Sequence, residues 1–236
     1  YAQDWDRWLK IIYDTQPDTY VVATGSASPA LMKGSRESGA GRWTVIQVPT
    51  MSFYEYCELL NLDRPNIASD LKVTTLLHKS QIERTQIMMQ LSKVQNHFMR
   101  YLQVGGFPEL ALADNDLMAQ QIMREDVVDK VLKRDLPSLY NIRNATELER
   151  IFLYLCNVSS EIVSIEAITK ELNGVSRTTV ENYIQYLESA NLIYQSWPVD
   201  MAGKKVLKAR PKIYIADAAI RNAVLMDDSV LTDPVE

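Results

Sequence analysis

The first part of the chain alternates between helix-type and strand-type hydrophobic spacing. Apolar residues recur at helical intervals over 4–14, and this spacing predicts a helix. Two short, continuous apolar runs follow at 20–23 and 43–48, and such runs are typical of buried parallel strands. The first run ends in Thr24-Gly25-Ser26, so it is expected to carry polar groups to the carboxyl end of a strand.

The middle of the chain is predicted to be helical. Ser52 precedes an aromatic segment, 53–60, and its hydroxyl is expected to cap a helix there. Apolar positions at helical spacing predict a long helix over 81–102, which Gly105-Gly106-Phe107-Pro108 ends because two glycines and a proline cannot continue it. Another helix is predicted over 116–135.

Beyond Asn144 the pattern changes to three short amphipathic helices and a hairpin. Each helix has one apolar stripe, formed in turn by Leu148, Ile151, Phe152 and Leu155, by Ile165, Ile168 and Leu172, and by Val180, Tyr183, Ile184 and Leu187. A glycine turn at 173–176 separates the second helix from the third, and strands are predicted at 192–197 and 212–216. This order predicts a winged helix-turn-helix.

A winged helix-turn-helix contacts DNA through its third helix, its wing, or both. Candidate contacts at the start of the third helix are Ser176, Arg177, Thr178, Thr179 and Asn182; candidates in the wing are Lys204, Lys205 and Lys208. Residues 176–190 carry a net charge of -1, one Arg against two Glu, whereas 199–212 carry +4, five Lys or Arg against one Asp. Phosphates attract cations, so DNA contact is expected mainly at the wing, and docking to protein alone stays equally open.

Composition narrows the function classes further. The net charge of -5 excludes a uniformly basic nucleic-acid coat. Two Cys and two His, without metal-ligand spacing, predict no metal site and no disulfide framework, and they fit a cytoplasmic protein. No apolar run reaches the length of a membrane span, so no membrane partner is expected. The 8 glycines include neither G-x-x-x-x-G-K-[ST] nor G-x-G-x-x-G.

Several motifs together resemble bacterial and archaeal AAA+-like P-loop ATPases that carry a C-terminal winged helix and, often, a further domain of unknown function. The motifs are Tyr1-Ala2-Gln3-Asp4-Trp5, Val22-Ala23-Thr24-Gly25-Ser26, Glu37-Ser38-Gly39-Ala40-Gly41-Arg42, Ser52-Phe53-Tyr54-Glu55-Tyr56, Gly105-Gly106-Phe107-Pro108-Glu109, Lys133-Arg134-Asp135-Leu136 and Lys212-Ile213-Tyr214-Ile215-Ala216-Asp217. The resemblance covers nearly the whole chain.

The resemblance implies that the chain supplies two parallel strands of a P-loop ATPase core. Thr24 or Ser26 would then be the sensor hydroxyl, which hydrogen-bonds the γ-phosphate or the attacking water. Arg42 would act on a phosphate or a neighbouring subunit, with a surface salt bridge as the alternative. The resemblance places the Walker A and Walker B region ahead of Tyr1. The chain is therefore expected to be a fragment that neither binds nor hydrolyses ATP, while the intact parent uses ATP and Mg²⁺.

The expected fold is mostly α with a small α/β part: a partial P-loop ATPase core, a helical lid region and a C-terminal winged helix-turn-helix. The expected divisions are 1–60, 61–143, 144–217 and a further segment, 218–236. Expected partners are DNA at the wing, a protein client, and a second copy paired through the strands of 20–48.

Two other functions are weighed against an ATPase fragment. The chain could be a stand-alone winged-helix DNA-binding regulator without ATPase activity. A metal-dependent nuclease is set aside because no spaced Glu-x-Lys follows Asp217. Asp217 is expected instead to cap a helix that begins at Ala218.

Overall fold

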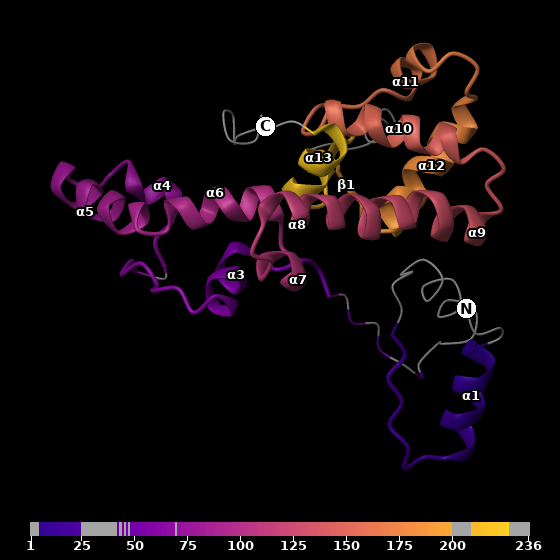
Figure 1. Ribbon diagram of the computed structural model, residues 1–236, viewed down its shortest axis with the longest axis horizontal. Helices are drawn as coiled ribbons and strands as arrows, with labels where there is room; N and C mark the ends of the chain where they lie inside the picture. The colour runs from indigo at the N-terminus through magenta and orange to yellow at the C-terminus, as the bar shows by residue number, and fades with distance from the viewer. Residues whose placement is uncertain are drawn as a thin grey trace. The chain divides into compact units, whose positions relative to one another are not determined.

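The computed structural model describes residues 5–24, 42, 44, 46, 48–68, 70–199 and 209–226. Within these residues the chain is mostly helical, with one small two-stranded antiparallel sheet. It divides into two compact units, Tyr1–Pro49 with Glu125–Ala216 and Thr50–Arg124 with Asp217–Glu236. Figure 1 labels the elements of both.

The N-terminal stretch of the first unit contains α1 (Trp5–Thr15), which confirms the first predicted helix. The parallel strands predicted at 20–23 and 43–48 are not confirmed. Residues 20–24, and the described residues of 43–48, lie outside any strand. Tyr20 is 100% exposed and Ile46 is 81% exposed. A parallel strand requires a hydrogen-bonded neighbour and covered faces, and the described residues supply neither to these segments.

The second unit begins with two helices whose starts are fixed by reciprocal caps. In α3 (Phe53–Leu59) the Ser52 hydroxyl accepts from the Glu55 backbone N–H, and the Glu55 carboxylate accepts from the Ser52 N–H. Ser80 and Glu83 repeat this arrangement at α5 (Gln81–Ser92), which follows the short α4 (Val73–Leu76). The predicted cap at Ser52 is confirmed.

The helix predicted over 81–102 is in fact two helices. α5 ends at Ser92, and α6 (Gln95–Val104) begins after a break at Lys93 and Val94. Val94 is buried, and none of these residues is a helix breaker, so sequence spacing gives no sign of the interruption. Gly105, with φ of 82°, ends α6 as predicted.

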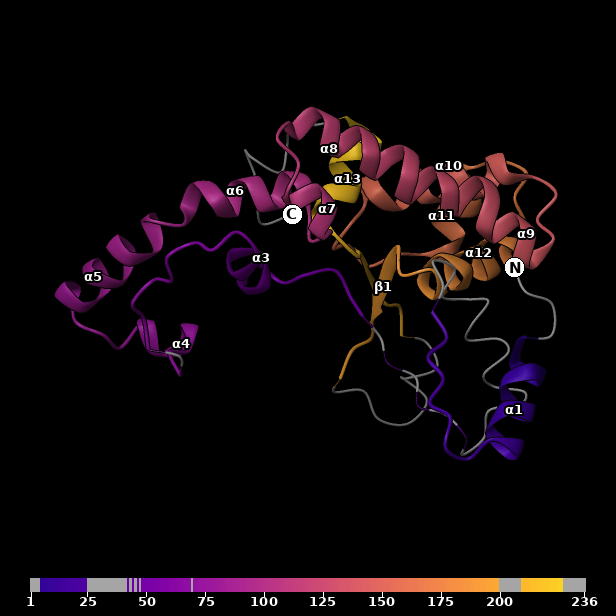
Figure 2. The same ribbon diagram turned by 60° about the horizontal axis from the view of Figure 1, so that its bottom comes forward.

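The rest of the second unit packs around α6. α7 (Pro108–Ala111) and α8 (Asp116–Ile122) follow in sequence, and α13 (Ala218–Leu225) returns from the end of the described chain to contact α6 and α8 (Figure 2). Phe53 and Tyr56 of α3 meet Phe98 and Tyr101 of α6 in an aromatic cluster. Tyr56 is fully buried there.

The helix predicted over 116–135 continues without interruption to Tyr140, so its predicted end at Asp135 is wrong. Two π-helical stretches, Met123–Asp129 and Val131–Asp135, lie between α8 and α9 (Leu136–Tyr140). The Leu136 N–H bonds the Val131 carbonyl, five residues back. This wider turn relieves the clash that Pro137 would make with an α-helical carbonyl four residues back, so the helix passes through the proline.

The first unit's core is formed by α10 (Ala145–Asn157), α11 (Ile165–Glu171) and α12 (Arg177–Ser189) with a strand pair. The predicted apolar stripes of the three helices are buried except at Ile165, which is half-buried. β1 (Ile193–Ser196) pairs antiparallel with β2 (Lys212–Ile215), with Tyr194 opposite Tyr214 and Ser196 opposite Lys212. Ile162 makes a further antiparallel bridge to Lys212 on the other side of β2.

Candidate functional site

Of the two sensor candidates, Thr24 and Ser26, the structure describes only Thr24. Thr24 is exposed and belongs to no helix or strand, and Ser26 lies outside the described residues. Arg42 donates from Nε to Oδ1 of Asp14 in α1 at 3.3 Å, with about a third of the side chain exposed. This contact is the surface salt bridge that was the alternative for Arg42, and such pairs contribute about 0–1 kcal/mol to stability.

The candidate contacts at the start of α12 lie on its N-cap and its first two turns. Ser176 is the N-cap, and its Oγ accepts from the Thr179 backbone N–H at 3.1 Å. The Ser176 and Thr179 hydroxyls also lie 2.9 Å apart, within hydrogen-bond distance. Thr178 is exposed, whereas Thr179 and Asn182 are half-buried. The hydroxyl of Ser176 is thus engaged in holding the helix start.

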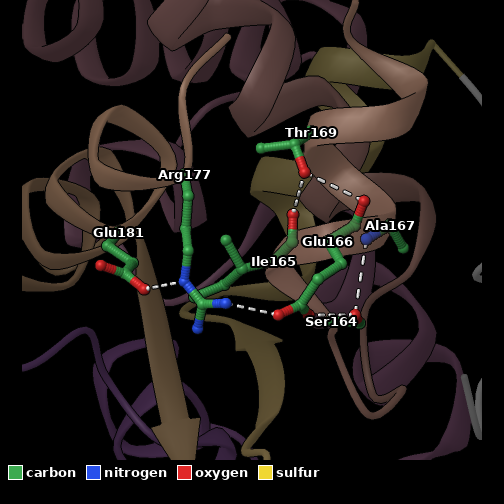
Figure 3. A network of polar contacts seen from close by, with 7 residues as sticks. All are labelled: Ser164, Ile165, Glu166, Ala167, Thr169, Arg177 and Glu181. Atoms are coloured by element: carbon green, nitrogen blue, oxygen red, sulfur yellow. Dashed lines mark hydrogen bonds and ion pairs between the residues drawn. The ribbon is translucent and has the colours of Figure 1, made fainter.

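Arg177 is held by two carboxylates (Figure 3). Its Nε donates to Oε1 of Glu181 at 2.8 Å, and its Nη1 donates to Oε1 of Glu166 in α11 at 2.6 Å. The other Glu166 oxygen accepts from the Ser164 hydroxyl at 2.8 Å. The hydrogen bond that Arg177 donates to Glu181, together with the charge of Glu166, raises the pKa of Arg177. Arg177 therefore lies between two compensating acids, and a phosphate would have to displace one of them.

The remaining DNA-contact candidates, Lys204, Lys205 and Lys208, lie outside the described residues. Of the cations in the same charged stretch, Arg210 and Lys212 are described, and both are exposed. Hydrogen bonds to its own backbone amide and to Ser164 lower the pKa of Glu166, and the charges of Arg177 and Arg210 add to this lowering. Arg210 thus lies close enough to Glu166 to act on it electrostatically.

Asp217, Gly106 and Met51 form a buried polar corner in the second unit. The sequence predicted only the helix-capping role of Asp217 there. Asp217 caps α13, as predicted, by accepting from the Ala219 N–H at 3.0 Å. Its other oxygen accepts from the Gly106 N–H at 2.8 Å, and the Thr50 side chain also bonds it. The Met51 N–H donates to the Gly106 carbonyl at 2.7 Å. Burial raises the pKa of Asp217, against the opposing effect of these hydrogen bonds.

Arg100 of α6 forms a second polar anchor in the second unit. Its guanidinium donates to Asp116 at 2.9 Å, to the Tyr56 hydroxyl at 2.9 Å, and to the carbonyls of Ala111 and Ala113 at 2.8 and 2.6 Å. Burial acts to lower the pKa of Arg100, but the bonds to Tyr56 and Asp116 leave it raised overall. The corner and this anchor are built from caps and carbonyl contacts, so both stabilise the fold. A single sequence carries no signal that pairs these distant residues.

Metal and membrane chemistry find no support in the described residues. Within them, no group of three or more His, Cys, Asp or Glu side chains is arranged to hold a metal ion. No helix in the described part of the chain combines the length and the apolar character needed to cross a membrane.

Two family models match the chain in succession. The model of an AAA domain matches residues 1–57, and the model described as a domain of unknown function (DUF8612) matches residues 95–230. No solved structure matches at a significant level.

Three uncharacterized proteins are similar over most of the chain. One from Methanocaldococcus jannaschii is 28% identical over 197 residues, 82% of this chain and 40% of that protein. One from Haemophilus influenzae is 24% identical over 222 residues, 92% of this chain and 49% of that protein. A second from M. jannaschii is 24% identical over 240 residues, 100% of this chain and 48% of that protein. The chain spans about half the length, or less, of the curated relatives it matches.

Proposed function

We propose that this chain, which belongs to the family of the domain of unknown function DUF8612, is part of an AAA-like ATPase. In this proposal the nucleotide-binding core is incomplete and a winged-helix docking module follows it. The observation that carries the proposal is the AAA-domain match over 1–57, which precedes the DUF8612 match over 95–230 in the same chain. This match favours an ATPase over a stand-alone DNA-binding regulator, since a regulator needs no AAA core.

ATP and Mg²⁺ belong to the longer protein in this proposal. The chain has no P-loop sequence, so its own residues cannot cradle the phosphates, and no step of hydrolysis is assigned to it alone. Thr24 or Ser26 would supply the sensor hydroxyl. Arg42 would leave Asp14 to reach a phosphate or a neighbouring subunit, and an exposed pair of this strength can be exchanged at small cost.

The proposed domain divisions are 1–60 for the end of the ATPase core, 61–143 for the helical lid, 144–217 for the winged helix and 218–236 for a following segment. Three features support a winged helix at 144–217. The helices α10, α11 and α12 precede an antiparallel strand pair, Ser176 caps the third helix, and the bridge from Ile162 extends the sheet.

The proposed docking partner of the winged helix is nucleic acid. Because Arg177 is compensated by Glu166 and Glu181, phosphate contact would fall on the basic stretch that contains Lys204, Lys205 and Lys208. A salt-dependent gel shift with Lys204→Glu and Lys205→Glu tests this. We expect weaker binding and a shallower salt dependence, while Lys72→Glu with Lys93→Glu, the same charge change elsewhere, leaves both unaltered. Binding unchanged by the first pair would refute the role of the basic stretch.

The ATPase proposal is tested on the longer protein by steady-state ATP turnover. If Arg42 stabilises charge on the transferred phosphate, Arg42→Ala lowers turnover by about 10³-fold or more. Arg64→Ala is the matched control, because Arg64 is also paired with an acid near the surface, in its case Glu58. Absence of ATP turnover by the unaltered longer protein would refute the proposal. Micromolar ATP binding by the 236-residue chain in calorimetry would refute the part of the proposal that places the phosphate-binding loop outside this chain.

A further inference from the structure

The two faces of the small sheet differ sharply in what covers them. Ile193 and Ile213 are buried against the helices of the first unit. Side chains alternate along a strand, so the opposite face carries the cross-strand pair Tyr194 and Tyr214. These two are 45% and 38% exposed. Ile162, opposite Lys212 on the other side of β2, extends the same face and is 63% exposed.

This face of the sheet is partly exposed to solvent, whereas both outer edges of the sheet carry hydrogen-bonded backbone groups. On β1, the Gln195 N–H donates to Oε1 of Glu188 at 3.1 Å, and the Gln195 side-chain amide donates to Oε2 at 2.7 Å. On the far side of β2, the Ser160 N–H donates to the Ile213 carbonyl at 2.7 Å. At these points a partner strand would meet a backbone donor on β1 and a backbone acceptor on β2 that are already hydrogen-bonded. The accessible feature is therefore a flat aromatic face and not a strand edge.

The charge around this face is complementary to phosphate. Lys212 is exposed and lies on the same face as Tyr214, two residues along β2. Arg210, also exposed, lies two residues before Lys212. The nearby acid Glu166 is bound by Arg177, and Glu188 is bound by Gln195. Lys212 is therefore the charged residue of the strand pair that shares a face with the two tyrosines, where it can meet a phosphate.

We propose that this face binds unpaired nucleic acid, with Tyr194 and Tyr214 stacking on bases and Lys212 contacting the backbone phosphate. The proposal rests on the docking role proposed above and specifies its ligand. Aromatic rings beside a basic strand suit single strands because every base has a π-face to stack on, whereas a duplex keeps those faces covered. An acidic protein partner would use the cations but would not require exposed rings.

The test is fluorescence anisotropy of the 236-residue chain with a labelled, mixed-sequence single strand of about 16 nucleotides, the upper size of known single-strand sites. We expect the single strand to bind more tightly than the same sequence as a duplex. Tyr194→Ala and Tyr214→Ala should each weaken binding by about tenfold, within the range for one lost base stack. Tyr194→Phe and Tyr214→Phe keep a stacking ring and should bind within about twofold of the unaltered chain.

Two further variants separate stacking from charge and from folding. Lys212→Gln should weaken binding and reduce the slope of log K against log salt by about 1. Tyr13→Ala, which removes a 53% exposed tyrosine from α1, should leave binding unchanged. Circular dichroism shows whether each alanine variant is folded, and the phenylalanine and glutamine variants test the proposal if an alanine variant is not.

The outcomes distinguish this inference from the proposal it rests on. Duplex binding that the lysine substitutions weaken, with no effect of either tyrosine, would overturn the stacking face alone. No binding of either nucleic acid would overturn the nucleic-acid docking role as well. Neither result bears on ATP turnover by the longer protein, which is measured separately.

Discussion

At the residue scale, two adjacent glycines allow distant segments to meet in the second unit. A Cβ on Gly105 would lie 2.5 Å from Oδ1 of Asp217, and one on Gly106 would lie 2.3 Å from the Met51 carbonyl oxygen. Both distances are far below contact distance. The helix-breaking role inferred from the sequence is therefore only part of why glycine stands at these positions.

We predict that Gly106→Ala lowers the free energy of unfolding by about 2–3 kcal/mol, because the methyl group forces the Met51 backbone away. Chemical denaturation measures the change. Gly174→Ala is the control for alanine in a turn: Gly174 has φ of 98° but nothing within 4 Å, so only backbone strain of about 1 kcal/mol applies. An equal or smaller loss at Gly106 than at Gly174 would contradict the close approach.

Asp217 makes the stability of the second unit depend on pH. Burial raises its folded-state pKa above the ordinary value of 3.8, so the folded state holds the proton more tightly than the unfolded state. This contribution is fully present below the unfolded pKa and is lost as the pH rises through the raised folded pKa. We predict that the unaltered chain loses stability relative to Asp217→Asn over that interval.

Urea denaturation at a series of pH values, upward from about pH 3, measures the difference between the two chains. The asparagine variant cannot titrate, so the other carboxyl groups contribute equally to both curves. A difference that instead increased with pH would mean that the hydrogen bonds from Gly106 and Ala219 outweigh burial and lower the pKa.

At the element scale, the sequence predicted what depends on local spacing and missed what depends on contacts. The buried stripes of α10, α11 and α12, and the caps at Ser52 and Asp217, were found because each lies within a few residues of its partner. The break between α5 and α6 and the passage of a helix through Pro137 were missed. Both depend on packing and on a hydrogen-bond pattern that no residue type announces.

The candidate site was predictable to the same limited extent. The pairing of Arg177 with Glu181 follows from their i,i+4 spacing on a helix. The second carboxylate, Glu166, comes from another helix, and only the fold brings it to Arg177. The outward tyrosines of β1 and β2 follow from strand alternation once the register is known, but the register itself is a tertiary fact.

A stacked tyrosine pair fixes the end of the long helical run to α12. The rings of Tyr140 and Tyr186 are 3.7 Å apart at their centroids and nearly parallel, and the Tyr140 hydroxyl lies 3.2 Å from that of Ser189. We predict a coupling energy of about 0.5–1.5 kcal/mol in a double-mutant cycle of Tyr140→Leu and Tyr186→Leu. Tyr54→Leu combined with Tyr186→Leu should be additive, since Tyr54 belongs to the other unit. Additivity in the first cycle would refute the stack.

At the scale of the whole molecule, exposed apolar residues near the N-terminus predict self-association. Tyr20, Val22, Ile46 and Val48 are at least 81% exposed, and the sequence of 20–48 favours strands. We expect sedimentation to show dimers or larger species that Val22→Asp with Ile46→Asp converts to monomer. Met88→Asp with Met89→Asp removes two exposed apolar residues of α5 and should not. A monodisperse monomer of the unaltered chain would contradict this prediction.

The bond between Gly106 and Asp217 joins residues 111 positions apart, and the second unit is interrupted in sequence by most of the first. During translation, Gly106 emerges long before the carboxylate that receives its N–H. At ribosomal rates the interval is roughly 5–20 s, ample time for the helices of the first unit to form. The helices of the first unit can therefore form before α13, the last helix of the second unit, has been synthesised.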